Sequence, residues 1–450
     1  MKKIKLLLTF IALLIIFFFG RECVVKIDEY YKIQKYGEPI SEDGTINNEY
    51  FAIDLNEQNA EKITEGINKA IEYANKNSIK YLKLEKGVYL IDGVSNIVNA
   101  NETDTKKGII LKSNLTFDLN GATLKQIAND KVNYAIISIT DVENVKLING
   151  KIEGDKNEHD YSKESTHEWG FGVDIRGSER IEIENLEISD CTGDGIIATD
   201  YKNRIKSSKD IRIKNTTIHD CRRNGISIIS AIGVEISENE IYHINGTAPQ
   251  SAIILESWDS KQIIDEVNIC NNKIYQNGIG IDIQTQAQNV NIYENDCSNN
   301  ILVLNSYGIC KIYDNEINDA ELQVSVEKEA YEQGRRINKA IVENNKLANT
   351  SLYILNVENI AIINNEILNS NISIYSSNCL VDKNKLENKN EMLYWGLRYY
   401  VSEFKKEKYD IYIGNNTYKG NYNTNESIME SERIELHKEN IYDYYNAIFK

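Results

Sequence analysis

Short apolar segments recur along most of the chain in the form apolar-x-apolar-x-x-(Asn)-x-apolar, in which the asparagine is present in most copies but not in all. Clear copies are residues 145–152 (VKLINGKI), 181–188 (IEIENLEI), 267–274 (VNICNNKI) and 360–367 (IAIINNEI). Successive copies follow one another at intervals of roughly 19 to 36 residues, and their last apolar residue falls at positions 152, 188, 218, 241, 274, 297, 317, 347, 367, 386 and 418. Short strands that repeat in this way, with loops of variable length between them, predict a parallel β-solenoid.

An asparagine shares one position in most copies: Asn239, Asn272, Asn295, Asn315, Asn345, Asn365, Asn384 and Asn416. Asparagine tolerates the left-handed backbone that a tight corner requires, and stacked amides can hydrogen-bond from rung to rung. We interpret these residues as structural. Leucine-rich repeats have a similar period, but their LxxLxLxxN signature is absent from this sequence.

A second strand in each repeat begins at Gly172, Gly195, Gly225, Ala252 and Gly280. Side chains alternate between the two faces of a strand, so one outward column is predicted as Asp174, Ile197, Ser227, Ile254 and Asp282. The next outward column is Arg176, Thr199, Ile229, Glu256 and Gln284, and the column before the strand is Phe171, Asp194, Asn224 and Ser251. We expect these columns to be exposed.

The ends of the chain differ from the repeats. Lys2, Lys3 and Lys5 precede an apolar run over residues 6–19, which is typical of an export signal and shorter than the roughly 20 residues of a membrane span. The predicted organisation is a signal peptide or N-terminal membrane anchor (1–22), a linker (23–50), the solenoid with a capping helix over 59–77 (51–420) and a helical cap (421–450) with its helix over 428–445. The protein is expected to be exported, and either secreted or anchored at the outer face of the cytoplasmic membrane.

The net charge of −17, from 68 acidic and 51 basic residues, argues against a nucleic-acid partner. The seven cysteines form no CxxC motif, so no metal site is predicted. Cys191 and Cys221 occupy the same position in adjacent rungs, which leaves apolar thiols and a disulfide as alternatives.

The repeat, the helix at 59–77 and the phrases GVYLIDG, IILKSNLTFDLNGATLKQ and TGDGI resemble the pectate-lyase-like right-handed parallel β-helix superfamily. The resemblance covers roughly residues 50–420 and implies an all-β right-handed β-helix with an N-terminal capping helix and a C-terminal cap. It also implies a polysaccharide partner, a monomer or a trimer, and calcium as the candidate cofactor. The same fold carries lyases, hydrolases, epimerases, phage tailspikes and adhesins, so it does not select one activity.

The resemblance to polygalacturonases is partial. Gly193-Asp194-Gly195 keeps one Asp of their catalytic pair, and Phe171 replaces the first Asp of their triad. Arg223-Asn224-Gly225 stands where they carry GHG, and Ile254-Leu255-Glu256 replaces their RIK. The chain therefore lacks most of their catalytic pattern.

The predicted catalytic cluster is Asp194, Arg222, Arg223 and His167. An arginine beside the site would neutralise a uronate carboxylate, His167 or an arginine would take the C5 proton, and Asp194 would orient the basic group or help to bind a cation. The leading hypothesis is a lyase that cleaves an acidic glycan by β-elimination. Six further residues are expected to bind substrate: Glu168, Trp169, Asp174, Arg176, Glu256 and Trp258.

Two alternatives stay open. For a glycoside hydrolase, the predicted register separates Asp194 from Asp174 by roughly 11 Å, and Asp194 from Glu256 by more, beyond the spacing of a catalytic dyad. A non-catalytic glycan-binding or surface protein is favoured by Ile197, Ile229 and Ile254, if these are exposed on the same face.

Overall fold

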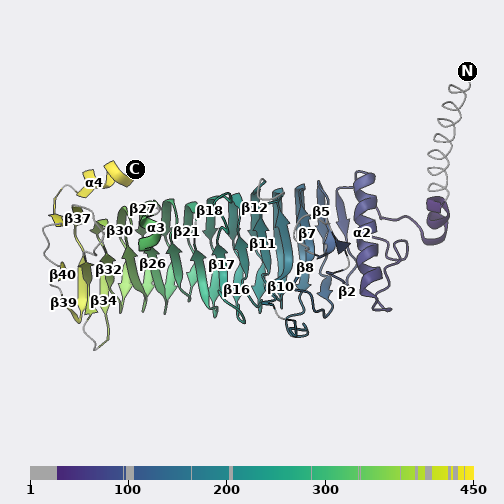
Figure 1. Ribbon diagram of the computed structural model, residues 1–450, viewed down its shortest axis with the longest axis horizontal. Helices are drawn as coiled ribbons and strands as arrows, with labels where there is room; N and C mark the ends of the chain where they lie inside the picture. The colour runs from purple at the N-terminus through teal and green to yellow at the C-terminus, as the bar shows by residue number, and fades with distance from the viewer. Residues whose placement is uncertain are drawn as a thin grey trace, which may run out of the picture.

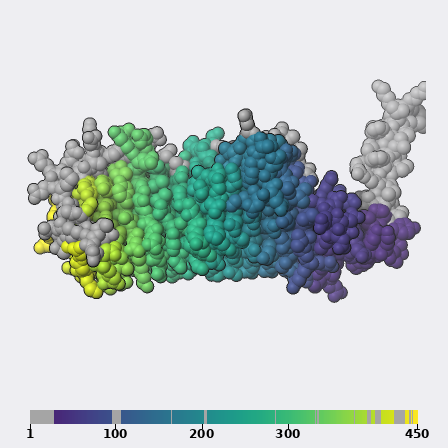
Figure 2. Space-filling model, turned by 90° about the horizontal axis from the view of Figure 1, so that it is seen from below, coloured from purple at the N-terminus to yellow at the C-terminus, as the bar shows by residue number. Residues whose placement is uncertain are grey.

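The computed structural model describes residues 28–449 except 95, 98–105, 164, 202–205, 285, 333, 335, 376, 391–393, 401–407, 424–426, 429–433 and 440. The chain winds into a long right-handed parallel β-helix, as predicted, and successive rungs stack along one axis (Figure 1). Figure 2 shows the same order on the surface, where the colours advance steadily from one end of the rod to the other. The predicted signal or anchor segment, residues 1–22, lies outside the described residues. Among the residues that are described, no helix is long and apolar enough to cross a membrane.

One sheet has 14 strands, one from each rung except the first, which contributes both β3 and β4. Its strands are β3 (Asn96–Ile97), β4 (Lys106–Ile110), β7 (Asn133–Thr140), β9 (Trp169–Arg176), β11 (Ile196–Thr199), β14 (Ile226–Ile228), β17 (Ser251–Leu255), β20 (Ile279–Ile283), β23 (Ile301–Leu304), β26 (Glu321–Ser325), β29 (Ser351–Leu355), β32 (Ile372–Tyr375), β36 (Leu397–Tyr400) and β40 (Ser427–Ile428). All its described pairings are parallel except β3 with β4.

The second sheet has 25 strands and forms the remaining sides of the coil. Its strands are β1 (Tyr81–Lys83), β2 (Val88–Ile91), β5 (Leu115–Asp118), β6 (Thr123–Gln126), β8 (Glu143–Glu153), β10 (Glu179–Ser189), β12 (Ser208–Lys214), β13 (Thr217–His219), β15 (Ala231–Ser237), β16 (Glu240–Tyr242), β18 (Ile264–Cys270), β19 (Lys273–Tyr275), β21 (Ala287–Tyr293), β22 (Asp296–Cys297), β24 (Gly308–Tyr313), β25 (Glu316–Asn318), β27 (Ile337–Glu343), β28 (Lys346–Ala348), β30 (Asn359–Ile363), β31 (Glu366–Leu368), β33 (Asn378–Asp382), β34 (Lys385–Asn388), β37 (Tyr409–Ile413), β38 (Thr417–Gly420) and β41 (Ile434–His437). Strands β35 (Tyr394–Trp395) and β39 (Tyr422–Asn423) form a separate pair, and helix α3 (Lys328–Glu332) interrupts the coil.

The N-terminal end of the coil is covered by helix α2 (Ala60–Lys76), which begins at the N-cap Asn59. Its predicted apolar face is buried: Ile63, Ile67, Ala70, Ile71 and Ala74. The predicted linker, 23–50, is in part packed. Residues 28–36 are helical, and Thr45 bridges Lys83 in β1. This packing arises because Ile46 and Tyr50 are apolar enough to be buried against the open first rung.

The C-terminal cap differs from the helix predicted over 428–445. The coil continues through β40 and β41, and helix α4 (Ile441–Phe449) begins only after them. The segment around Leu436 instead pairs in parallel register with β37. Helix α4 then places Tyr445 and Phe449 against an outward apolar cluster of Ala361, Ile363 and Leu380.

The asparagine ladder is confirmed as a structural feature. Asn315 Nδ2 donates to Asn345 Oδ1 at 2.9 Å, and Asn295 Nδ2 donates to Asn315 Oδ1 at 2.9 Å. The expected reason was wrong in one respect, because the left-handed residue is the one before the ladder position, such as Asp314 (φ 57°) and Asn344 (φ 58°). The ladder amides are buried, apart from the partly exposed Asn416 at the end of the ladder, so their role is to satisfy backbone groups inside the corner.

Replacing Asn315 with Ala is expected to lower the free energy of unfolding by roughly 2–4 kcal/mol, because it leaves several buried partners unsatisfied. These include the backbone nitrogen and the Nδ2 of Asn295, which both donate to Asn315 Oδ1. Urea denaturation of the variant measures the loss. Asn291→Ala removes a partly exposed amide that donates to Asn268, and it should change stability by less than about 0.5 kcal/mol. Equal losses for both variants would contradict the structural role of the ladder.

Candidate functional site

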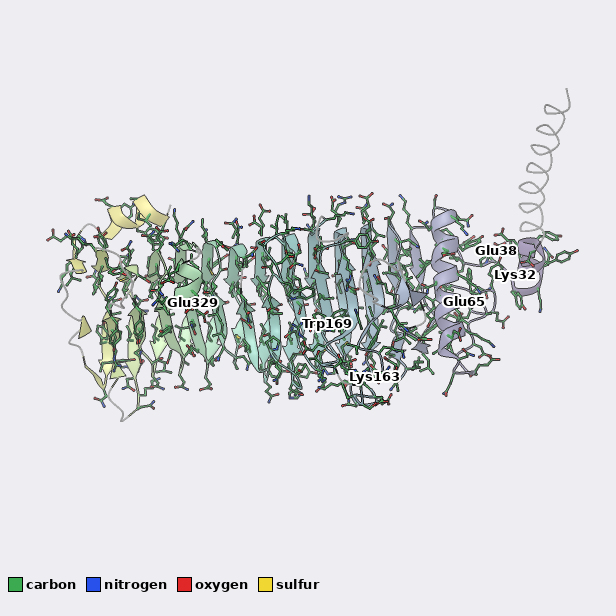
Figure 3. The ribbon with its side chains drawn as sticks, in the orientation of Figure 1. Lys32, Glu38, Glu65, Lys163, Trp169 and Glu329 are labelled. Atoms are coloured by element: carbon green, nitrogen blue, oxygen red, sulfur yellow. The ribbon has the colours of Figure 1, made fainter. Side chains whose placement is uncertain are left out.

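The predicted site residues lie on or beside strands β9, β11, β14 and β17 of the 14-stranded sheet, and two of them, His167 and Glu168, lie in the loop that precedes β9. The strand register there matches the predicted columns: Asp174 pairs with Ile197, Ile197 with Ser227, Ser227 with Ile254, and Ile254 with Asp282. Figure 3 labels Trp169 on these central rungs and Lys163 in the loop that projects below them. This loop, residues 154–168, connects β8 to β9.

The columns are not exposed, which corrects the sequence-based expectation. Ile197, Ile229 and Ile254 are each 0% exposed. Phe171, Ile197 and Ile229 form a small apolar cluster on the outside of the sheet, and Trp169 packs against it. The exposed isoleucines that would have favoured a non-catalytic surface protein are therefore not present on this face.

Arg223 is the centre of the site. It is 6% exposed, and its Nη1 donates to Asp194 Oδ2 at 3.1 Å. Its Nε lies 3.6 Å from Glu168 Oε2, and its Nη2 lies 3.8 Å from Glu256 Oε2. The guanidinium also lies over the Trp169 ring, 5.6 Å from its centroid. One arginine thus joins three carboxylates that come from three different rungs.

Asp194 pairs with one arginine, as the adjacent rungs suggested, and this arginine is Arg223. The Asp194 side chain is fully buried. Burial raises the pKa of Asp194, while Arg223 and a hydrogen bond from Ser227 oppose the rise. The Asp194–Arg223 pair therefore depends on each partner, because either charge alone would be buried without compensation.

Arg222 lies outside this cluster. Its Nη1 donates to the backbone oxygens of Thr166 at 2.9 Å and His167 at 3.1 Å. The guanidinium lies 4.9 Å from the centroid of the Tyr161 ring. Arg222 thus ties the 154–168 loop to the rung of Arg223.

His167 is also engaged in holding this loop. It is 1% exposed, its Nδ1 lies 2.9 Å from His159 Nε2, and its Nε2 lies 3.2 Å from the Lys163 backbone oxygen. His159 Nδ1 in turn lies 2.8 Å from Asp155 Oδ2. Both ring nitrogens of His167 therefore have partners inside the protein, and the imidazole does not face the Arg223 cluster's carboxylates in any described contact.

Asp174 and Arg176 form a second ion pair on the same face. Arg176 Nε donates to both carboxylate oxygens of Asp174 at 2.8 Å, and Lys107 Nζ lies 3.9 Å from Asp174 Oδ2. Lys107 is 4% exposed and was not predicted from the sequence. It lies on β4, two rungs before Asp174, where the repeat is too irregular to assign a column.

Trp169 and Trp258, predicted to contact sugar, lie edge to face with ring centroids 5.3 Å apart. Trp258 is 38% exposed. An aromatic ring that is half accessible beside charged groups offers an apolar surface to a polar ligand. The two residues come from β9 and from the turn after β17.

Asp282 lies on the same face of the sheet, in a column that the sequence analysis predicted without selecting this residue. It is 1% exposed, Gln284 Nε2 donates to its Oδ2 at 3.0 Å, and its Oδ1 is buried without a hydrogen-bond partner. Burial raises the pKa of Asp282 to about 6; Gln284 opposes this rise and Glu256 adds to it. The sequence could have indicated this residue, because the predicted columns place Asp282 one rung and two residues away from another carboxyl group, that of Glu256.

The raised pKa of Asp282 predicts a pH-dependent stability. The folded chain holds the Asp282 proton more tightly than the unfolded chain, so the free energy of unfolding should fall as pH rises from about 4 to about 6. The pKa difference corresponds to roughly 2–3 kcal/mol. Asp282→Asn has no proton to lose, so it should match the native chain near pH 4 and exceed its stability above pH 6. Parallel pH dependences of the two chains in urea denaturation would contradict this assignment.

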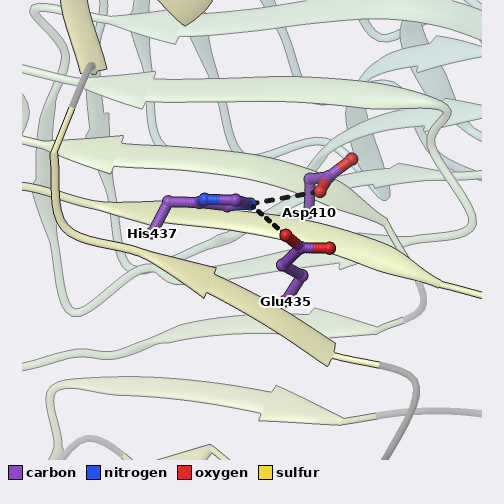
Figure 4. Close-up of side chains that lie close together, drawn as sticks. All are labelled: Asp410, Glu435 and His437. Atoms are coloured by element: carbon purple, nitrogen blue, oxygen red, sulfur yellow. Dashed lines mark hydrogen bonds and ion pairs between the residues drawn. The ribbon is translucent and has the colours of Figure 1, made fainter.

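Cys191 and Cys221 are both free thiols in the core, so the disulfide alternative does not hold. The calcium that the resemblance implies stays a prediction. Among the described residues, a group of three side chains with metal-ligand spacing is Asp410, Glu435 and His437 (Figure 4). It lies on β37 and β41, at the opposite end of the rod from α2 (Figure 1).

Comparison with known proteins agrees with the observed coil. The family model "Right handed beta helix region" matches residues 86–265. The uncharacterized protein YclG of Bacillus subtilis is 30% identical over 355 residues, which are 72% of this chain and 60% of YclG. The SPbeta prophage-derived protein YorA of the same organism is 35% identical over 156 residues, 34% of this chain and 26% of YorA. The chain therefore spans less than two thirds of either relative.

Two solved structures share the fold at low identity. The A-module of the mannuronan C-5 epimerase AlgE4 of Azotobacter vinelandii matches with a TM-score of 0.53 and 12% identity, over 83% of this chain and 96% of the module. The tailspike protein of E. coli bacteriophage HK620, solved with a pentasaccharide, matches with a TM-score of 0.50 and 9% identity, over 83% of this chain and 71% of the tailspike. Together with the family model over residues 86–265, these likenesses agree with the right-handed parallel β-helix fold of the structure.

Proposed function

We propose that this chain hydrolyses glycosidic bonds of a polysaccharide on the outer face of β9 to β20. The observation that carries the proposal is the pair formed by Asp282 and Glu256. One is a buried carboxyl whose pKa is raised to about 6, and the other lies beside the Arg223 guanidinium. Two carboxyl groups in unlike environments are what glycoside hydrolysis requires.

The backbone spacing of the pair leaves room for an inverting mechanism. Adjacent rungs lie about 4.8 Å apart and residues about 3.3 Å apart along a strand, which gives the Asp282 and Glu256 backbones a separation of about 8 Å. Inverting enzymes have carboxyl groups about 6.5–9.5 Å apart, with room for a water between them. Asp282 would donate its proton to the glycosidic oxygen as the bond to the anomeric carbon breaks. Glu256 would take a proton from the water that attacks this carbon.

The burial of Asp282 adds a condition to this mechanism. Its free Oδ1 must meet the glycosidic oxygen, so the side chains that cover it have to part when a glycan binds. Trp258 is the more exposed of the two tryptophans and offers the first contact surface. Sugar rings would stack on Trp258 and Trp169, whose contact forms an aromatic corner above Arg223.

The electrostatics favour a neutral glycan over an acidic one. Arg223 is shared by Asp194, Glu168 and Glu256, so the cluster has more negative than positive charge. A uronate carboxylate at this position would meet three carboxylates. A lyase for an acidic glycan requires an arginine that is not already paired with protein carboxylates, so that it can bind the uronate. It also requires a side chain that is available to accept the C5 proton. Because both ring nitrogens of His167 have internal partners, we rank hydrolysis above β-elimination.

The named ligands of the two structural neighbours, mannuronan and a pentasaccharide, support a carbohydrate as the ligand class. We further propose that the chain is exported through its N-terminal segment, residues 1–22, and acts outside the cytoplasm. The elongated shape of the molecule (Figure 2) suits a polymer that is extended along the surface.

The test is incubation of the purified full chain with a panel of neutral and acidic polysaccharides. New reducing ends without absorbance from unsaturated sugars, on a neutral polymer, are the expected result. Unsaturated products would establish the lyase instead. Retention of the chain on immobilised glycan with no product would leave a binding protein, and neither retention nor product on any polymer would overturn the proposal.

A further inference from the structure

The terminal strand of the coil carries a convergent set of metal-ligating groups. Strand β41 pairs in parallel with β37, with Asp410 opposite Glu435 and Tyr412 opposite His437. His437 Nε2 lies 3.2 Å from Asp410 Oδ1 and 4.0 Å from Glu435 Oε1. Figure 4 shows the three side chains pointing toward one another from the two strands. One donor atom of each residue lies within 4.8 Å of the other two.

The orientation of the imidazole is fixed by a neighbour. The His437 ring stacks on the Tyr412 ring, with centroids 4.3 Å apart and an interplanar angle of 13°. Tyr412 belongs to the strand that also carries Asp410, so the stack holds Nε2 in the direction of both carboxylates. This arrangement reduces the ordering that metal binding would otherwise require.

Another histidine in the same chain provides a contrast. His219 also stacks on a tyrosine, Tyr242, at 5.0 Å and 3°. It too has two carboxylates nearby, but Asp220 lies 2.7 Å from its Nδ1 and Glu187 lies 3.8 Å from its Nε2. Carboxylates at opposite nitrogens cannot share one ion with the ring. At His437 both carboxylates approach the same nitrogen.

The donor set selects the class of metal. Imidazole nitrogen with carboxylate oxygen suits zinc, whereas calcium prefers six to eight oxygen ligands. Tetrahedral zinc ligands at about 2.0–2.1 Å from the ion lie about 3.3 Å from each other. His437 Nε2 and Asp410 Oδ1, which are 3.2 Å apart across a hydrogen bond, are already close to this value, and Glu435 Oε1 would have to approach the same nitrogen from 4.0 Å. The side chains are partly exposed, so a water can complete the coordination.

We propose that Asp410, Glu435 and His437 form a zinc-binding site that fastens β41 to β37. Among the described strands, β41 has β37 as its one pairing partner, so it is the end of the sheet. The strand also connects the coil to helix α4, which covers the apolar cluster of Ala361, Ile363 and Leu380. An ion bound by both strands would hold the cap closed. The proposal is independent of the hydrolytic site.

The test uses the full chain after removal of metal with a chelator, titrated with zinc chloride in a calorimeter. One equivalent of Zn²⁺ is expected to bind, and His437→Ala should bind it about tenfold or more weakly. The matched control is His219→Ala, which also removes a histidine stacked on a tyrosine and should bind zinc as the native chain does. Equal zinc binding by the native chain and His437→Ala, or none by the native chain, would overturn the proposal.

Hydrogen exchange provides a second measurement, which shows where along the chain zinc binds. Zinc should slow amide exchange in peptides that cover β37 and β41 in the native chain and in His219→Ala, with no change in β13. In His437→Ala the slowing should be absent. Protection spread over the whole coil, or present in His437→Ala, would mean that zinc binds elsewhere.

Discussion

Asp282→Asn is expected to reduce the rate of glycan hydrolysis by about 10²–10⁴-fold, the usual contribution of a general acid. Asparagine keeps the size of the side chain and its contact with Gln284 but has no acidic proton to give. The native activity should decline as pH rises above about 6, because Asp282 then loses its proton. Initial rates on a polysaccharide identified by the panel, measured across pH, test both statements.

The matched control is Asp296→Asn, an exposed aspartate on β22 of the other sheet, which should leave the rate and its pH dependence unchanged. Retained glycan binding by Asp282→Asn, with hydrolysis lost, separates a catalytic defect from a folding defect. A variant Asp282→Asn that hydrolyses glycan at the native rate would refute the role of Asp282, even if the chain is a hydrolase.

Arg223→Ala is expected to cost about 3–5 kcal/mol of folding free energy, because it leaves the fully buried Asp194 carboxylate without its counter-charge. Glu168 and Glu256 also lose their shared partner, so glycan binding should weaken in the same variant. The loss of stability should shrink at low pH, where Asp194 becomes protonated and no longer needs the arginine. Urea denaturation at several pH values measures this dependence.

Arg222→Ala provides the adjacent control. It removes hydrogen bonds to two backbone oxygens and one contact with Tyr161, so its cost should be about 1–2 kcal/mol and nearly independent of pH. The double variant Arg223→Ala with Asp194→Asn should recover part of the stability that Arg223→Ala loses. No recovery, or equal losses for the two arginines, would show that the buried pair does not decide stability here.

The rung register is the feature that the sequence predicted best. Alternation of apolar and polar residues within each short strand is local, and it gave the pairing of Asp174 with Ile197 and of Ile254 with Asp282. The asparagine ladder and the buried face of α2 were predictable for the same reason. The C-terminal helix was placed too early, because apolar spacing over residues 428–445 fits a helix and does not reveal that β37 offers a pairing edge.

The predicted site residues separate into groups that the sequence could not distinguish. Two adjacent arginines have the same local pattern, yet Arg223 lies among three carboxylates and Arg222 ties down a loop. His167 was an attractive base because it is polar and close to Trp169 in the chain. Only the folded loop shows that His159 and Lys163 occupy its ring nitrogens.

The sequence by itself determined the coil, its register and the face on which the charged residues gather, because strand alternation and repeat spacing are properties of neighbouring residues. The tertiary structure alone decided what is buried on that face. Side chains from separate rungs fold over one another there, so that Ile229 and Asp282 lie out of solvent although they point away from the core. Residues that are distant in the sequence bury Asp282, which raises its pKa, and they supply the ion-pair partners of Arg223. The local sequence pattern contains no information on either contact.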